Sequence, residues 1–209
     1  MRQVLGRLAV ANDFVRIIDR LDSIEGFLMP LEGYALLLMA QYGPGTGAVV
    51  EIGSYLGRST CFLAIGAQRA GRPAVVAVDH FEGSPEHQAG KSHQSSVLVA
   101  EGTTYNQFLR NLERAKVSDH VKPVRSGSLE AAKNWSGPIR LLFIDGDHSY
   151  QSSRDDFRAW SGNVESNGLV AFHDVGVWPG VTGFYKELLA EGRWREQASV
   201  QSLRVVARA

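Results

Sequence analysis

The sequence has a single cysteine, Cys61, no excess of either charge and no long apolar run. One cysteine cannot form an internal disulfide bond and is typical of a reducing compartment, so we expect a cytoplasmic protein. The 22 basic and 22 acidic residues give a formal net charge of zero, which leaves no electrostatic reason to expect nucleic acid or an anionic membrane as a partner. No stretch reaches the ~18 to 20 uninterrupted apolar residues that a membrane span needs.

The chain is long enough for one domain with a small appendage. It has 209 residues, of which 44% are hydrophobic, so it can bury a substantial core. We expect residues 1–30 to form an N-terminal helical segment and residues 31–209 to form the main domain. Residues 1–22 have the spacing of an amphipathic helix, which would pack on its own domain or form the contact of a homodimer.

Apolar runs alternate with segments of helical spacing along the main domain. We predict five strands, at residues 48–52, 74–79, 121–125, 139–145 and 168–174. We predict helices between and after them, at residues 59–69, 103–116, 128–134, 149–160 and 181–191. This alternation is typical of a parallel sheet, and the almost continuous apolar runs indicate that helices cover both faces. Residues 195–209 differ, because they are predicted to form a hairpin that adds an antiparallel edge.

Residues 80–102 lack this alternation. They follow the second strand, at the carboxyl edge where doubly wound sheets bind ligands. A long irregular connection in a compact domain is usually functional or mobile, so we predict a lid over the substrate, with a disordered loop as the alternative. Its histidines, His80, His87 and His93, could meet the substrate, although histidines in a polar loop are more often solvated.

A glycine-containing turn, VVEIGSYLGRST, follows the first strand and leads into a helix. Gly53 and Gly57 allow positive φ and a close approach of the backbone to a ligand. The turn lacks the spacing of dinucleotide-binding and phosphate-binding loops, and Glu51 beside it would repel a pyrophosphate. Asp79 ends the second strand, where it could accept hydrogen bonds from a ribose diol. The alternative is a tight turn that only joins strand to helix.

The strands of LLFIDGDHSY and LVAFHDVG each end in acids and a histidine. Asp145, Asp147 and His148 lie at the tip of one strand, and His173 and Asp174 lie at the tip of the next. Because the carboxyl ends of parallel strands share one edge of a sheet, these side chains are expected to lie near the glycine-containing turn.

Together, VVEIGSYLGRST, AVVAVDHFEG, LLFIDGDHSY and GLVAFHDV resemble the class I S-adenosylmethionine-dependent methyltransferases. Within them the chain is similar to small-molecule O-methyltransferases of the catechol, caffeoyl-CoA and macrolide-sugar type. The resemblance covers about residues 31–209. It implies an α/β, Rossmann-like doubly wound sheet of seven strands in the order 3-2-1-4-5-7-6, with the last strand antiparallel and helices on both faces.

The resemblance also implies roles for individual residues. Gly53 and Gly57 would line the methionine part of the cofactor with Glu51 nearby, Asp79 would hold the ribose hydroxyls, and Ser128 would meet adenine. The full set of residues that it assigns to S-adenosylmethionine comprises Glu51, Gly53, Ser54, Gly57, Ser59, Asp79, His80, Ser128 and Asp145.

A metal site and a catalytic base are implied in the same way. Asp145, His173 and Asp174 would bind Mg²⁺, which would orient two substrate oxygens and lower the pKa of a hydroxyl. His148 would take the proton. An imidazole suits other metals better than Mg²⁺, so His173 could also turn away, the metal could differ, or no metal could bind. Asp147 could orient His148 or cap the next helix.

The predicted function is transfer of a methyl group to a hydroxyl of a small molecule, assisted by a divalent cation, with His148 and Asp145 as catalytic residues. Three alternatives are an NAD-type oxidoreductase, a non-catalytic module that binds the cofactor, and a metal-dependent hydrolase. Trp178 could form a wall of the substrate pocket or pack structurally. The acceptor stays open between sugar, catechol and polyketide hydroxyls.

Overall fold

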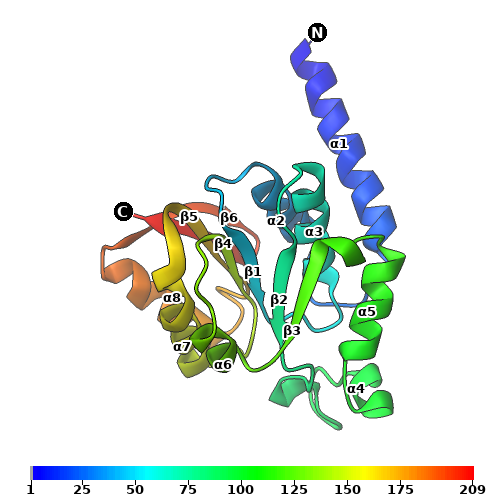
Figure 1. Cartoon of the computed structure of the whole chain (residues 1–209), viewed down its shortest axis with the longest axis vertical. Helices are drawn as coiled ribbons and strands as arrows, with labels where there is room; N and C mark the ends of the chain where they lie inside the picture. Colours follow the sequence, from blue (N-terminus) through cyan, green and yellow to red (C-terminus); the bar gives the residue numbers. More distant parts are fainter. Residues whose placement is uncertain (1) are drawn as a thin grey trace.

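A seven-stranded sheet runs through the protein with helices on both faces (Figure 1). The computed structural model describes residues 2–209. The strand order is β3-β2-β1-β4-β5-β7-β6, and β7 runs antiparallel to both of its neighbours, which confirms the predicted topology. The strands are β1 (Ala48–Ile52), β2 (Val75–Asp79), β3 (Val121–Arg125), β4 (Ile139–Ile144), β5 (Val164–Phe172), β6 (Trp194–Val200) and β7 (Leu203–Arg208).

Eight α-helices lie in the described residues, and none of them is long and apolar enough to cross a membrane. They are α1 (Arg2–Leu21), α2 (Pro30–Tyr42), α3 (Arg58–Arg69), α4 (Ser96–Glu101), α5 (Tyr105–Arg114), α6 (Ser128–Lys133), α7 (Tyr150–Trp160) and α8 (Pro179–Ala190). Short 3₁₀ turns span Pro85–His87, Ser118–His120 and Ser161–Asn163.

Each central strand is apolar on both faces because it contributes to two cores. On β1, Val49 packs in the core that includes α2, α3 and α5, while Val50 packs in the core that includes α7 and α8. Leu141 and Leu142 on β4 alternate in the same way. This burial on both sides explains why these runs show no alternation of polar and apolar residues.

Helix α1 projects away from the rest of the molecule (Figure 1). Its last turns pack on the main domain through Ile17 and Leu21, which are buried. Farther toward the N-terminus, Leu8 and Val10 are 61% and 56% exposed. The predicted packing on its own domain therefore holds for the end of the helix, and a homodimer contact through the exposed part stays a prediction.

The segment between β2 and α5 has more structure than the sequence indicates. It contains the 3₁₀ turn Pro85–His87 and helix α4. His80 and His93 are exposed, as expected. His87 is only 8% exposed, so the expectation that it is solvated is wrong. Its ring packs against the rings of Phe27 and Tyr55, which no local pattern in the sequence reveals.

Helices α2 and α3 approach so closely that glycine is required between them. A Cβ atom on Gly66 would lie 2.3 Å from the carbonyl oxygen of Leu37, and one on Gly33 would lie 2.4 Å from the ring of Phe62. The first contact is with backbone, which cannot rotate away. The position of α2 relative to the sheet thus depends on Gly66.

We predict that Gly66→Ala lowers the free energy of unfolding by about 2–3 kcal/mol, because the added methyl group forces two packed helices apart. Urea denaturation measures this change. Gly6→Ala is the control, since nothing lies within 4 Å of a Cβ at this helical position. It should be neutral or slightly stabilising, and an equal loss in both variants would contradict the close approach.

Candidate functional site

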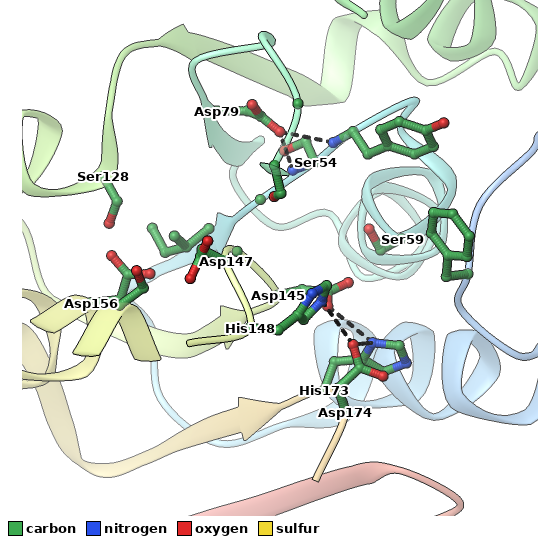
Figure 2. Close-up of a pocket in the computed structure, with 18 of the residues that line it drawn as sticks. Ser54, Ser59, Asp79, Ser128, Asp145, Asp147, His148, Asp156, His173 and Asp174 are labelled. Carbon is green, nitrogen blue, oxygen red and sulfur yellow. Dashed lines mark hydrogen bonds and ion pairs between the residues drawn. The ribbon is translucent and has the colours of Figure 1, made fainter. Parts of the chain in front are cut away.

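The carboxyl ends of β1, β2, β4 and β5 open into one cavity of about 840 Å³ (Figure 2). A volume of this size suits a small-molecule site. The predicted site residues that line it are Gly53, Ser54, Ser59, Asp79, His80, Ser128, Asp145, His148, His173 and Asp174.

Glu51 and Gly57 do not line the cavity, and their contact with the cofactor stays a prediction. Glu51 is fully buried beneath the turn, where it accepts hydrogen bonds from the hydroxyls of Ser54 and Thr60. Gly57 has a φ of 87° and starts α3 with its Cα facing the ring of Phe108. Both residues support the conformation of the turn on the side away from the cavity.

Asp79 holds the glycine-containing turn from the neighbouring strand. Its Oδ2 accepts hydrogen bonds from the amides of Ser54 (2.7 Å) and Tyr55 (2.9 Å), and its Oδ1 accepts one from the amide of Phe81 (2.6 Å). Tyr55 has a φ of 47°, a conformation that is unfavourable for a side chain of this size. A carboxylate offers about four acceptor positions, so Asp79 keeps capacity for a ligand hydroxyl.

His173 lies between carboxylates. Its Nδ1 is 3.0 Å from Asp145 Oδ1, and its Nε2 is 3.1 Å from Glu32 Oε2. Burial lowers the pKa of His173, but the charges and hydrogen bonds of these carboxylates and of Asp174 outweigh it and raise the pKa far above the usual range. The ring is therefore an imidazolium with both nitrogens engaged.

Glu32 was not predicted. It lies on α2, is fully buried, and accepts hydrogen bonds from the amide (2.8 Å) and hydroxyl (2.7 Å) of Ser202, in the turn between β6 and β7. Burial opposes its ionisation, but the hydrogen bonds from His173, Ser202 and Met29 lower its pKa to about 2. The one feature of the sequence that could have identified Glu32 is that it is a lone acid within an apolar helical segment.

Asp145, His148 and Asp174 form the group that could hold a cation, because one ligand atom from each lies within 4.8 Å of the others. Two carboxylates and an imidazole are a reasonable donor set for a divalent cation. The predicted ligand His173 is not part of this group; its ring nitrogens contact Asp145 and Glu32. Its role as a metal ligand stays a prediction.

His148 is held in a defined orientation. Its ring stacks on Trp178, with centroids 4.6 Å apart and planes 7° apart. Its Nε2 is 3.0 Å from Asp174 Oδ2, and its Nδ1 is 2.7 Å from Glu86 Oε1, which comes from the segment between β2 and α5. Burial lowers the pKa of His148, but Asp174 and the neighbouring acids raise it overall.

Asp156 lies at the end of the cavity opposite to His148, near Ser128 at the start of α6 (Figure 2). Asp156, on α7, lines the cavity beside Ser128 and is only 7% exposed. Burial raises its pKa to about 6 against a hydrogen bond from Ser128. Sequence reasoning missed Asp156, since RDDFRAW is indistinguishable from a solvated helical face. Asp147 accepts a hydrogen bond from the amide of Ser149 (2.8 Å), at the start of α7.

We predict that Glu51→Gln changes stability in a pH-dependent way. Burial raises the pKa of Glu51 from its usual 4.5 to about 7. The native state therefore holds this proton more tightly than the unfolded chain, and this contribution is present below pH 4.5 and lost as the pH rises through about 7. Glutamine carries no titrating proton, so Glu51→Gln does not lose this contribution. The free energy of unfolding of the variant should therefore rise relative to that of the wild type by roughly 2–3 kcal/mol as the pH increases across this window.

Urea denaturation between pH 4.5 and 8 measures the difference between the two proteins. Glu130→Gln serves as the control, since Glu130 is exposed on α6 and forms only a surface ion pair with Lys133. A constant difference between Glu51→Gln and wild type over this range would show that Glu51 titrates normally.

The sequence matches a family model described as a methyltransferase domain over residues 50–175, more than half of the chain. Similar solved structures include the O-methyltransferase NovP, with 18% identity, a TM-score of 0.63, and coverage of 86% of this chain and 78% of that one. An O-methyltransferase from Bacillus cereus in complex with SAH has 20% identity, a TM-score of 0.62 and coverage of 94% and 90%.

The SAH-bound methyltransferase PaMTH1 from Podospora anserina has 12% identity, a TM-score of 0.67 and coverage of 99% and 96%. At these identities the solved structures establish the fold, and the family model establishes the family. The chain belongs to the methyltransferase-domain family, with the fold of the class I S-adenosylmethionine-dependent methyltransferases.

Proposed function

We propose that the protein is an S-adenosylmethionine-dependent O-methyltransferase that acts on a hydroxyl of a small molecule. The observation that carries the proposal is a single cavity that joins Asp79 and the glycine-containing turn to the cluster of Asp145, His148 and Asp174. The first part suits an adenosine with a sulfonium side chain, and the second suits a hydroxyl that must lose its proton.

The cofactor would lie along the strand tips in a defined direction. The remaining acceptor capacity of Asp79 suits a ribose hydroxyl, and the backbone at Gly53 and Ser54 leaves room for the methionine part. The adenine would reach the end of the cavity formed by Ser128 and Asp156, where the buried carboxyl of Asp156 can accept a hydrogen bond from the exocyclic amine. The acids that line the cavity favour a positively charged sulfonium and disfavour the pyrophosphate of NAD.

When bound, S-adenosylmethionine would supply the methyl group for an in-line displacement at its methyl carbon. The substrate oxygen would form the new C–O bond as the S–C bond breaks, and the electron pair of that bond would stay on sulfur. Neutral His148 would receive the hydroxyl proton, and Asp174 and Glu86, which lie 3.0 Å and 2.7 Å from its ring nitrogens, would stabilise the imidazolium that results. Most of the rate enhancement would come from alignment of oxygen, carbon and sulfur within the cavity.

We also propose that Asp145 and Asp174 hold a divalent cation such as Mg²⁺. When bound, the cation would lower the pKa of the substrate hydroxyl and neutralise part of the acidic cluster. His148 could be a third ligand by geometry, but its Nε2 cannot bind a cation and accept a proton at the same time. We assign it as the base, because Trp178 and Glu86 hold its ring toward the cavity.

We expect S-adenosylhomocysteine at 100 times its Kd to raise the unfolding midpoint by about 5–10 °C, since such binding adds roughly 2.7 kcal/mol to stability. NAD⁺ at the same concentration should have no effect. Asp79→Ala should weaken binding of S-adenosylhomocysteine at least tenfold by calorimetry, whereas the exposed control Asp119→Ala should not. Absence of any response of the wild-type protein to S-adenosylhomocysteine would refute the proposed function.

We expect Asp145→Asn to weaken Mn²⁺ binding by about 10–100-fold, measured by electron paramagnetic resonance. His148→Gln should keep Mn²⁺ affinity within about threefold but lower kcat by about 10²–10⁴-fold, because it removes the base. Turnover is followed with labelled S-adenosylmethionine and a panel of phenolic and sugar acceptors. If His148→Gln loses Mn²⁺ affinity as strongly as Asp145→Asn, His148 is a metal ligand and the base must lie elsewhere.

A further inference from the structure

The end of the cavity next to His148 is built from aromatic rings. These rings come from segments that are far apart in the sequence: the loop before α2, the glycine-containing turn, the segment between β2 and α5, and the connection between β5 and α8. The aromatic wall, as we call this set, comprises Phe27, Tyr55, His87, His93 and Trp178.

The members of the aromatic wall contact one another in a continuous layer. His87 lies 4.8 Å from Tyr55 and 5.5 Å from Phe27 between ring centroids, and both contacts are stacked. His93 lies 5.3 Å from Phe27 and 5.9 Å from Trp178, which in turn stacks on His148. Burial lowers the pKa of His87, so its ring is neutral at pH 7 and behaves as an aromatic surface.

Large apolar side chains that are at least half exposed to solvent surround the opening of the cavity. Phe27 and Met29 are each 51% exposed and Val177 is 63% exposed, and all three line the cavity. An exposed apolar surface of this kind at a concave site indicates contact with an apolar ligand. Scattered exposed apolar residues are common in proteins, but these three converge on one opening.

The charges in the cavity point to the same class of ligand. Arg58 is the one lysine or arginine among the described residues that line it. Two of its guanidinium nitrogens are already engaged, since Nε donates to the carbonyl of Leu28 (3.1 Å) and Nη1 donates to the carbonyl of Ile24 (2.7 Å). Nine acids line the cavity and outnumber its cationic groups, which are Arg58, the imidazolium of His173 and the proposed divalent cation. A phosphate or carboxylate on the acceptor would therefore meet net repulsion.

From the aromatic wall, the apolar opening and the engaged Arg58, we infer that the acceptor is a planar aromatic compound that carries a hydroxyl and has no phosphate or carboxylate. Its ring would lie against the aromatic wall, which brings the hydroxyl to His148. This inference rests on the proposed function. It disfavours a sugar nucleotide, which is neither planar nor uncharged.

Calorimetry on the full chain saturated with S-adenosylhomocysteine tests the inference with matched probes. Catechol and cis-1,2-cyclohexanediol carry the same two hydroxyls on a six-membered ring, and only the first is aromatic. Catechol should bind about tenfold more tightly, since stacked aromatic contacts contribute on this scale. In the same way, 3,4-dihydroxybenzyl alcohol should bind more tightly than 3,4-dihydroxybenzoate. Equal binding within either pair, or no binding of the aromatic probes, overturns the inference.

A variant of the aromatic wall tests whether this wall causes the preference for an aromatic probe. Phe27→Leu keeps an apolar side chain but removes the ring, and it should reduce the preference for catechol about fivefold while leaving binding of S-adenosylhomocysteine unchanged. Tyr42→Leu is the control, because this ring is 72% exposed at the end of α2 and does not line the cavity. An unchanged preference in Phe27→Leu overturns the assignment of the aromatic wall. Failure of the wild-type protein to bind S-adenosylhomocysteine would instead refute the proposed function.

Discussion

The candidate site depends on one buried chain of charges, from Glu32 through His173 to Asp145. Each carboxylate would be costly to bury alone, and the imidazolium between them makes burial possible because opposite charges alternate. These three charged side chains connect α2, β5 and the end of β4. Ser202 of the C-terminal hairpin joins them through its hydrogen bonds to Glu32. The residues that would perform the chemistry are thereby fixed to four separate elements of the fold.

Much of the fold was predictable because its signals are local. Continuous apolar runs identify strands buried on both faces, and their alternation with helices leads to the parallel sheet. The carboxyl ends of such strands share one edge, so the proximity of Asp79, Asp145 and Asp174 was also predictable. The resemblance supplied the strand order and the reversed β7, which hydrophobic patterns alone could not.

The sequence could not show contacts between side chains that lie far apart along it. His173 was predicted as a metal ligand, and its second nitrogen contacts Glu32, 141 residues earlier. His87 was expected in solvent, but Phe27 and Tyr55 cover it. Glu51 was predicted at the cofactor, and the structure shows its Oε2 bound by the hydroxyls of Ser54 and Thr60, which the sequence alone does not reveal. Acid and histidine motifs give the position of a site, whereas partners from other elements determine which atoms remain free to react.

The aromatic wall and the strand tips come from different parts of the chain. Phe27, His87, His93 and Trp178 lie on connections, whereas Asp79, Asp145 and Asp174 lie at or just after the carboxyl ends of strands. Connections tolerate exchange better than strand ends, because few backbone hydrogen bonds of the sheet depend on them. The acceptor range could therefore diverge among descendants of this chain, or be redesigned, by replacement of these connections while the cofactor half of the cavity is inherited unchanged.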